Sequence, residues 1–249
     1  MVILKLPEEI EKARASNRIV AEVLSKLKEK VKPGVTTREL DRFAEEIAEK
    51  RGAKPAFKGY RGYPYALCTS INQEVVHGMP SARVLKEGDI IGLDFGVCYR
   101  GFFGDATITL PVGKVAAGAL RLMEVTEQSL YAGIAQAKEG NRLGDISAAV
   151  QMTVEAAGFS VVRDFVGHGI GKNLHEEPQI PNFGKKGRGV ELKSGMILAI
   201  EPMVNQGDYK VIVLSDGWTV VTEDGKLSAH FEHSIAITEH GPEILSKLS

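Results

Sequence analysis

Cysteine, net charge and long apolar runs are all scarce in this chain of 249 residues, and each scarcity excludes a class of protein. The two cysteines, Cys68 and Cys98, form neither a CxxC pair nor a disulfide framework, which fits a reducing compartment. The formal net charge is -1, whereas binding to nucleic acid or an anionic membrane usually requires a basic excess. No apolar run approaches the roughly 20 residues of a membrane helix, and the N-terminus turns acidic at Glu8 instead of forming a signal peptide. We therefore expect a cytoplasmic protein with no direct nucleic-acid or membrane binding.

What is present is a globular composition, 43% hydrophobic and 25% charged, with helix and strand signals. Pro7, followed by two glutamates, indicates the start of a helix. Thr36 with Glu39 three residues later predicts a capping box for a second helix, which Gly52 ends. Strand-like stretches follow at residues 66–76, 89–98 and 106–112. The segment 101–104, before the last of them, is interpreted as a turn.

An internal repeat is the most informative feature of the sequence. Two blocks of the first half recur in the second, residues 85–97 over 192–204 and residues 103–108 over 231–235. The alignment places Asp94 over Glu201 and Asp105 over Glu232, so that acid matches acid. The predicted fold class is α/β (α+β), with an antiparallel-rich sheet covered by helices. We predict a single domain over residues 1–249, built from two pseudo-symmetric halves at 8–112 and 113–240.

The four acidic residues of the repeat predict a metal site. Asp94 lies in an apolar, strand-like run, and a buried carboxylate costs several kcal/mol unless a partner neutralises it. For Asp94 alone, a structural ion pair with an arginine is an equally good interpretation. If the halves are related by a pseudo-twofold axis, however, four carboxylates converge near that axis and need cations. Two divalent ions would balance the charge, and manganese, iron, cobalt or zinc suit carboxylate and imidazole ligands.

Histidines supply the remaining candidates. His168 stands between two glycines, which let backbone and metal approach closely, and we predict that it is a ligand. His77 and His175 also lie near glycines, although a lone histidine in such a setting is more often a loop or core residue.

Signatures of other enzymes are incomplete. His175 and Glu176 begin like the zinc-protease motif HExxH, but Gln179 stands where the second histidine belongs. No GxSxG motif supports a serine hydrolase, and the tripeptide at 94–96 matches the kinase DFG without the other kinase motifs. The glycines at 167–171 lack the spacing of a dinucleotide-binding fingerprint.

Together with the surrounding motifs, these residues resemble the methionine aminopeptidase family, of the short bacterial type, over essentially the whole chain. The matching motifs are NQEVVHGMP at 72–80, GHGIG at 167–171, HEEP at 175–178 and EP at 201–202. The resemblance implies a pita-bread fold without an N-terminal zinc-binding extension. It also implies two divalent metal ions per chain (cobalt, manganese, iron or zinc) and five ligands, which are Asp94, Asp105, His168, Glu201 and Glu232.

The resemblance further implies a reaction. One metal would bind Asp105, His168, Glu201 and Glu232, and the other Asp94, Asp105 and Glu232. A water between the ions would attack the first peptide carbonyl of the substrate, with Glu201 as the proton acceptor. His77 would contact the scissile amide, and His175 would stabilise the tetrahedral intermediate.

The implied substrates are the N-termini of nascent polypeptides and peptides, with a small second residue preferred. The methionine pocket would be formed by Tyr63, Cys68 and Trp218, with Tyr60 at its rim. The protein would be a monomer that associates transiently with the ribosome.

The chain departs from the family pattern at four positions, which leaves its side-chain selectivity open: Phe57, Arg61, Leu174 and His230. Two rival functions share the fold. A proline-specific peptidase usually carries an extra N-terminal domain, for which the early start of the repeat leaves no room. A non-catalytic binding protein, such as a growth-regulating factor, typically loses metal ligands, whereas all five candidates are present here.

Overall fold

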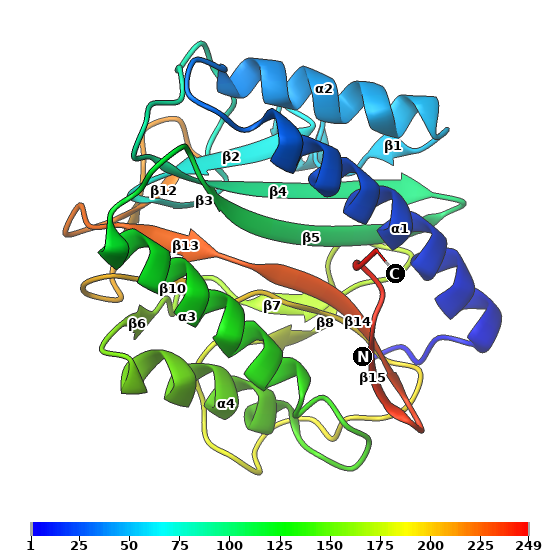
Figure 1. Cartoon of the computed structure of the whole chain (residues 1–249). Coiled ribbons are helices and arrows are strands. Elements are labelled where there is room, and N and C mark those ends of the chain that lie inside the picture. Colours follow the sequence, from blue (N-terminus) through cyan, green and yellow to red (C-terminus); the bar gives the residue numbers. More distant parts are fainter. Residues whose placement is uncertain (1, 249) are drawn as a thin grey trace.

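Four α-helices cover one face of a curved, antiparallel sheet in residues 2–248, the part of the chain that the computed structural model describes (Figure 1). The helices are α1 (Pro7–Lys30), α2 (Thr37–Lys50), α3 (Ala117–Ile134) and α4 (Leu143–Ala156). Helix α1 begins at Pro7 as predicted. The predicted capping box of α2 is also present, because the Glu39 amide donates to the Thr36 hydroxyl and the Thr36 amide donates to the Glu39 carboxylate.

The main sheet has nine strands among the described residues, and every pairing in it is antiparallel. Its path runs through β1 (Lys54–Pro55), β4 (Ile90–Tyr99), β5 (Phe102–Pro111), β14 (Glu232–Thr238), β9 (Ile197–Ile200), β7 (Gly167–Gly169) and β8 (Glu176–Ile180). Strand β2 (Leu67–Ile71) pairs with β4, and β15 (Gly241–Ile244) pairs with β14. Two small sheets consist of β13 (Ser228–His230), β10 (Met203–Asn205) and β6 (Ser160–Val161), and of β11 (Val211–Val213), β12 (Val220–Thr222) and β3 (Glu74–Val76).

Each helix pair forms its own apolar core against the sheet. Leu27 of α1 and Phe95 of β4 belong to the first core, and Leu122 of α3 and Ile235 of β14 belong to the second. Complete burial of a side chain of this size contributes about 1.5–3 kcal/mol. The two parts are joined where β5 pairs with β14. The order of two helices followed by strands thus occurs twice along the chain. The boundaries of the two pseudo-symmetric halves, at residues 8–112 and 113–240, stay a prediction.

The first long hairpin corrects the sequence analysis. The turn predicted over residues 101–104 is wrong, because β5 already begins at Phe102 and Tyr99 pairs with Phe102. The strand predicted at 106–112 therefore runs from 102 to 111. The turn itself is Arg100 and Gly101, whose φ angles of 51° and 78° are typical of a two-residue hairpin that matches the twist of its strands.

Gly104 has a packing role in β5 and not a turn role. A Cβ at this position would lie 2.7 Å from the Asn17 backbone nitrogen and 2.9 Å from the Ser16 carbonyl carbon of α1. Helix and strand are also tied by polar contacts, since the Ser16 hydroxyl donates to the Phe102 carbonyl at 2.9 Å. The glycine therefore permits the close contact that places α1 behind the residue that follows it, Asp105.

We expect Gly104→Ala to lower the free energy of unfolding by about 1–3 kcal/mol, because α1 must move to admit the methyl group. Urea denaturation followed by circular dichroism measures this change. Gly118→Ala is the matched control, since a Cβ at that helical position would meet only the Gln206 side chain, at 3.4 Å. The control should be neutral or slightly stabilising because alanine favours helix. Equal stability of the two variants would contradict the packing role of Gly104.

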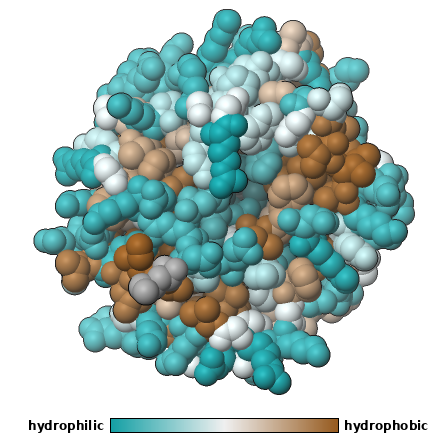
Figure 2. Space-filling model, turned by 180° about the vertical axis from the view of Figure 1, so that it is seen from behind, coloured by the Kyte–Doolittle hydropathy of each residue, from teal (hydrophilic) through white to brown (hydrophobic). Residues whose placement is uncertain are grey.

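The face of the molecule turned away from the viewer in Figure 1 is mostly hydrophilic, with hydrophobic side chains in one group at the upper right and another at the lower left (Figure 2). Exposed apolar residues include Ile212 and Val213 of β11, which retain 47% and 55% of their accessible surface. Within residues 2–248, none of the helices combines the length and the apolar character that crossing a membrane would require.

Candidate active site

The five predicted ligands come from consecutive strands of the main sheet. Its path β4, β5, β14, β9, β7 contributes one each: Asp94 in β4, Asp105 in β5, Glu232 at the start of β14, Glu201 directly after β9, and His168 in β7. Strand register brings neighbours together, because Thr107 of β5 pairs with both Asp94 and Glu232. Residues that span 139 positions in the sequence thus meet across five adjacent strands.

The side chains converge as well as the strands. Ligand atoms of Asp105, His168 and Glu232 all lie within 4.8 Å of one another, and all three residues are buried. Glu201 joins this group, since its Oε1 lies 3.5 Å from His168 Nε2. Asp94 and Asp105 lie close enough to influence each other's ionisation.

Burial and mutual repulsion disfavour the negative charges. Burial raises the pKa of Asp94 to about 7. Burial, followed by the charges of Glu232 and Asp94, raises the pKa of Asp105 well above its ordinary value. Glu201 and Glu232 have pKa values raised by burial first and by neighbouring carboxylates second. Four such groups in one place are unfavourable as anions unless cations join them.

Unpartnered atoms show that the donor set fits divalent metal ions. Asp94 Oδ1, Asp105 Oδ1 and Glu232 Oε1 are buried and have no hydrogen-bond partner. Among residues 2–248, the ion pairs of this cluster join Glu201 only to His168 and His230, and none supplies an arginine to Asp94. The alternative of a structural Asp94–arginine pair is therefore excluded for the described residues. Oxygen-rich sites with one imidazole are typical of manganese, iron, cobalt or zinc.

His168 is held in the form that a metal requires. Its Nδ1–H donates to the Gly169 carbonyl at 2.9 Å, which leaves Nε2 unprotonated and directed towards Glu201. Burial lowers the pKa of His168 to about 3, so the ring is neutral at physiological pH. Hydrogen bonding of one ring nitrogen to a backbone carbonyl commonly orients a ligating histidine.

His77 sits at the edge of the same cavity in a strained conformation. Its φ of 60° lies in the left-handed region, which is uncommon for a residue with a side chain. The carbonyl of the next residue, Gly78, accepts a hydrogen bond from the Thr69 amide of β2 at 2.7 Å, and a Cβ at Gly78 would lie only 2.3 Å from the Thr69 carbonyl oxygen. The His77 ring makes edge contacts with Phe165 and Trp218, at centroid distances of 5.7 and 6.1 Å.

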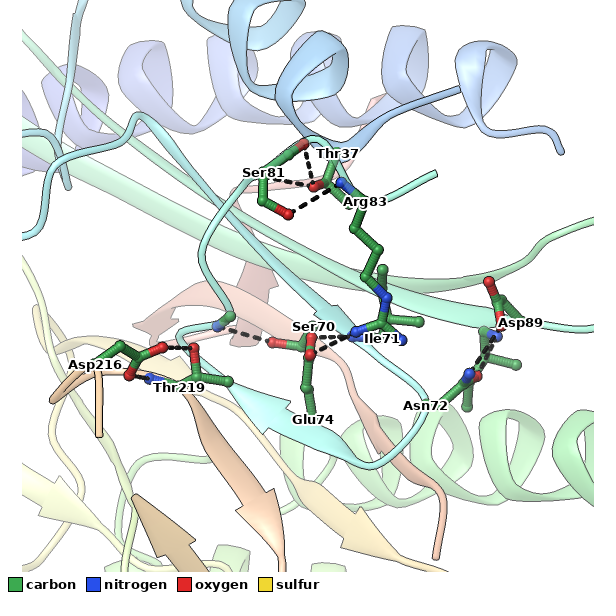
Figure 3. A network of polar contacts seen from close by, with 12 residues as sticks. Thr37, Ser70, Ile71, Asn72, Glu74, Ser81, Arg83, Asp89, Asp216 and Thr219 are labelled. Atoms are coloured by element: carbon green, nitrogen blue, oxygen red, sulfur yellow. Dashed lines mark hydrogen bonds and ion pairs between the residues drawn. The ribbon is translucent and has the colours of Figure 1, made fainter. Parts of the chain in front are cut away.

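A polar network holds the segment from β2 to β3, which precedes His77 in the chain (Figure 3). Glu74 lies at its centre, where its carboxylate accepts from the Ile71 amide at 2.7 Å and from Arg83 at 2.7 Å. The Gly78 amide donates to the Ser70 hydroxyl at 3.3 Å. These contacts hold β2, β3 and Gly78 in place and so restrain the unusual backbone of His77, which lies between β3 and Gly78.

His175 is held by Tyr60, the residue predicted for the rim of the methionine pocket. The Tyr60 hydroxyl lies 2.8 Å from His175 Nδ1, and the His175 ring centroid lies 4.3 Å from that of His168. Burial, with a smaller effect of the Arg61 charge, lowers the pKa of His175 to about 4. A neutral imidazole therefore faces the carboxylate cluster.

A cavity of about 400 Å³ connects these groups. All eleven predicted site residues line it. Three of the residues that depart from the family pattern also line it, namely Phe57, Arg61 and Leu174. Tyr63 donates its hydroxyl to the Leu67 and Gly78 carbonyls and meets Trp218 edge to face at 5.1 Å. Burial raises the pKa of the Cys68 thiol well above its ordinary value, so it is a neutral wall of the cavity.

Several lining residues were missed by the sequence analysis. They are Val76, Asp164, Phe165, Val166, Gln179 and Met203. Position in the chain offered a signal, because each lies within three residues of a predicted site residue or a quoted motif. His230 does not line the cavity, but its Nε2 is buried, unpartnered and 3.7 Å from Glu201 Oε2.

Comparisons with known proteins agree with this geometry. The sequence profile of metallopeptidase family M24 matches residues 11–239. A methionine aminopeptidase of Clostridium perfringens is 56% identical over 246 residues, which are 99% of each chain. Methionine aminopeptidase 1 of Bacillus subtilis is 53% identical over 248 residues, or 100% of each chain. The crystal structure of a methionine aminopeptidase from Thermotoga maritima superposes with a TM-score of 0.98 at 51% identity, and the match covers 100% of both chains. The pita-bread fold expected from the sequence is thereby confirmed.

Proposed function

The chain belongs to metallopeptidase family M24, and from this premise we propose that it removes the N-terminal methionine from peptides and nascent proteins at a dinuclear metal site. Its relatives over the full length are named methionine aminopeptidases, so the predicted class, a metallo-aminopeptidase, is confirmed. The dinuclear centre, the substrate preference and the role of each residue belong to the proposal. One observation carries it, namely that the five predicted ligand side chains come from five consecutive strands and line a cavity with three unpartnered carboxylate oxygens.

Two divalent ions fit the charge of the cluster. Asp105 and Glu232, which lie at its centre, would be shared by both ions; Asp94 would complete one set, and His168 with Glu201 the other. Ions in such a site supply a polarised water for attack and Lewis acidity towards the carbonyl oxygen. Carboxylate ligands with one imidazole suit cobalt, manganese, iron or zinc.

The side chains would divide the remaining work. Glu201 would accept the proton of the attacking water, a role supported by its burial beside His168 and by its raised pKa. Donation from the Tyr60 hydroxyl to His175 Nδ1 would leave the proton on Nε2, where it can donate to the negative charge that develops on the carbonyl oxygen. His77, restrained by the polar contacts of the neighbouring segment, would contact the scissile amide.

An apolar pocket would select methionine. Tyr63, Cys68 and Trp218 form a neutral, polarisable wall, and a thioether packs well against aromatic rings. A charged first side chain should be rejected because its desolvation is not compensated there. The second residue of the substrate would pass the rim between Tyr60 and His77.

We expect the rate to fall with the size of the second residue. A peptide series Met-X-Ser, with X from glycine to leucine, lysine and tryptophan, measures kcat/KM as a function of that size. Loss of fit at one rim position should cost roughly 1–3 kcal/mol, or about 10- to 200-fold in kcat/KM. Equal values of kcat/KM for glycine and tryptophan would contradict selection of the second residue at this rim.

Replacing His175 by alanine should lower kcat on the order of 100-fold, because a preorganised donor to the oxyanion is lost. The metal content, measured by mass spectrometry of the dialysed protein, should equal that of the wild type, since His175 is not a proposed ligand. Loss of a metal ion in this variant would instead make His175 a ligand.

A three-peptide assay separates the proposed function from its rivals. Met-Ala-Ser, Leu-Ala-Ser and Ala-Pro-Ala are each incubated with the protein, with and without added manganese or cobalt. Methionine aminopeptidase activity cleaves the first peptide best and depends on the metal. Preference for Ala-Pro-Ala would favour a proline-specific peptidase, and no cleavage would favour a binding protein. A monomeric state and transient ribosome association stay predictions.

A further inference from the structure

His175 is carried by an irregular segment, the His175 loop, which we define as residues 170–175 between β7 and β8. A tight turn inside it is closed by the Gly171 amide, which donates to the Asn173 carbonyl at 3.1 Å. The Phe103 amide donates to the Gly171 carbonyl at 2.8 Å and ties the turn to β5. Because the loop is neither helix nor strand, contacts with other segments set the position of His175.

Lys5 reaches this loop from the N-terminal segment and is buried there. Its Nζ lies 2.5 Å from Glu176 Oε2, and the two side chains retain only 4% and 6% of their accessible surface. The backbone of Lys5 is fixed too, since its amide donates to the Gly195 carbonyl at 2.7 Å. The ammonium group donates a further hydrogen bond to the Ile3 carbonyl at 3.1 Å. Both ends of the lysine are therefore held.

Glu176 connects Lys5 to the His175 loop. Its second oxygen, Oε1, accepts from the Asn173 amide at 3.0 Å, so that one carboxylate binds the ammonium group and the turn at once. Gly171 packs directly on the pair, because a Cβ there would lie 2.5 Å from Lys5 Cε and 2.9 Å from Glu176 Oε1. Desolvation offsets most of the attraction in a buried ion pair, so such a pair contributes more to geometry than to net stability.

We propose that Lys5 is a positioning residue, whose buried ion pair with Glu176 sets the place of His175 in the active site. The inference rests on the catalytic role proposed for His175. A second ion pair offers a matched comparison on the same loop. Lys172 Nζ lies 2.7 Å from Glu9 Oε1, but the Lys172 side chain is 67% exposed. A solvent-exposed ion pair of this kind is weak and restrains the position of the loop only slightly.

Steady-state kinetics on Met-Ala-Ser with saturating manganese test the inference. Lys5→Met should lower kcat about tenfold or more, as expected for a misplaced catalytic group, with KM within about threefold of wild type and unchanged metal content. Lys172→Met should stay within about twofold of wild type. If Lys5 acts through His175, Lys5→Met should cause no further loss of kcat in a His175→Ala background. Additive losses, or a Lys5→Met variant as active as wild type, would overturn the assignment.

Two further measurements cover the remaining outcomes. Lys5→Met alone leaves the buried Glu176 carboxylate without a partner and can prevent folding. The double variant Lys5→Met, Glu176→Gln removes both charges and should fold. Its kcat should still be lower by about tenfold or more, as expected for a misplaced catalytic group. A wild-type kcat in that double variant would mean that Lys5 only neutralises the charge of Glu176, and it would overturn the proposed positioning role. Hydrogen exchange at the Asn173 amide needs no activity: it should speed up in Lys5→Met and not in Lys172→Met. An inactive wild-type protein would contradict the proposed function. Unchanged hydrogen exchange in Lys5→Met would contradict only the proposed positioning role of Lys5.

Discussion

Replacement of Asp105 by alanine is expected to lower kcat/KM on the order of 1,000-fold or more, because a ligand shared by both proposed metal ions is removed. The same variant should unfold less readily than the wild type when both proteins are metal-free. Asp105 is buried, its Oδ1 has no partner, and its pKa is raised by burial and by Glu232. Removing such a group relieves a cost of roughly 1–3 kcal/mol.

Opposite effects on activity and on the stability of the metal-free protein distinguish a functional carboxylate from a structural one. Peptidase assays and urea denaturation in the presence of a chelator measure the two quantities. Glu46→Ala is the control, because Glu46 forms an exposed pair with Lys50, with 62% of its side chain accessible. It should leave both quantities within about 0.5 kcal/mol of wild type. A destabilised, still active Asp105→Ala variant would make Asp105 a structural residue.

Removal of divalent ions should abolish the peptidase activity, and manganese, cobalt or iron should restore it. The holoprotein should also be more stable, since an ion at about 100 times its dissociation constant stabilises the folded state by about 2.7 kcal/mol. Thermal unfolding with and without chelator measures this difference. Asp105→Ala should show little of the shift because its site is broken. An equal shift in that variant would locate the stabilising ions elsewhere.

Much of the fold was accessible from local signals in the sequence. The capping box of Thr36 and Glu39 requires only three neighbouring residues, and it forms as predicted. The repeat matched Asp94 with Glu201 and Asp105 with Glu232, and the structure places these four residues in or directly after β4, β5, β14 and β9, which are four consecutive strands of one sheet. Acidic residues in apolar strands conflict with burial unless they have a function, which is why they indicated a candidate site from one sequence.

What failed or was missed depends on distant contacts. The segment 101–104, with a glycine at each end, was interpreted as a turn, but Gly104 is required by α1, which lies nearly ninety positions earlier in the chain. The pairing of Lys5 with Glu176 joins residues 171 positions apart, and no local pattern indicates it. Phe165 enters the cavity because β7 lies beside β9, an adjacency that the order of elements along the chain does not determine.

Titration of metal-free protein with manganese, with free ion measured by electron paramagnetic resonance, tests the dinuclear centre most directly. We expect two ions per chain in the wild type. Asp94→Ala should bind one, because Asp94 is proposed to contact a single ion, and Asp105→Ala should bind neither tightly. Wild-type protein that binds fewer than two ions per chain, or that cleaves Met-Ala-Ser at the full rate without metal, would contradict the dinuclear centre.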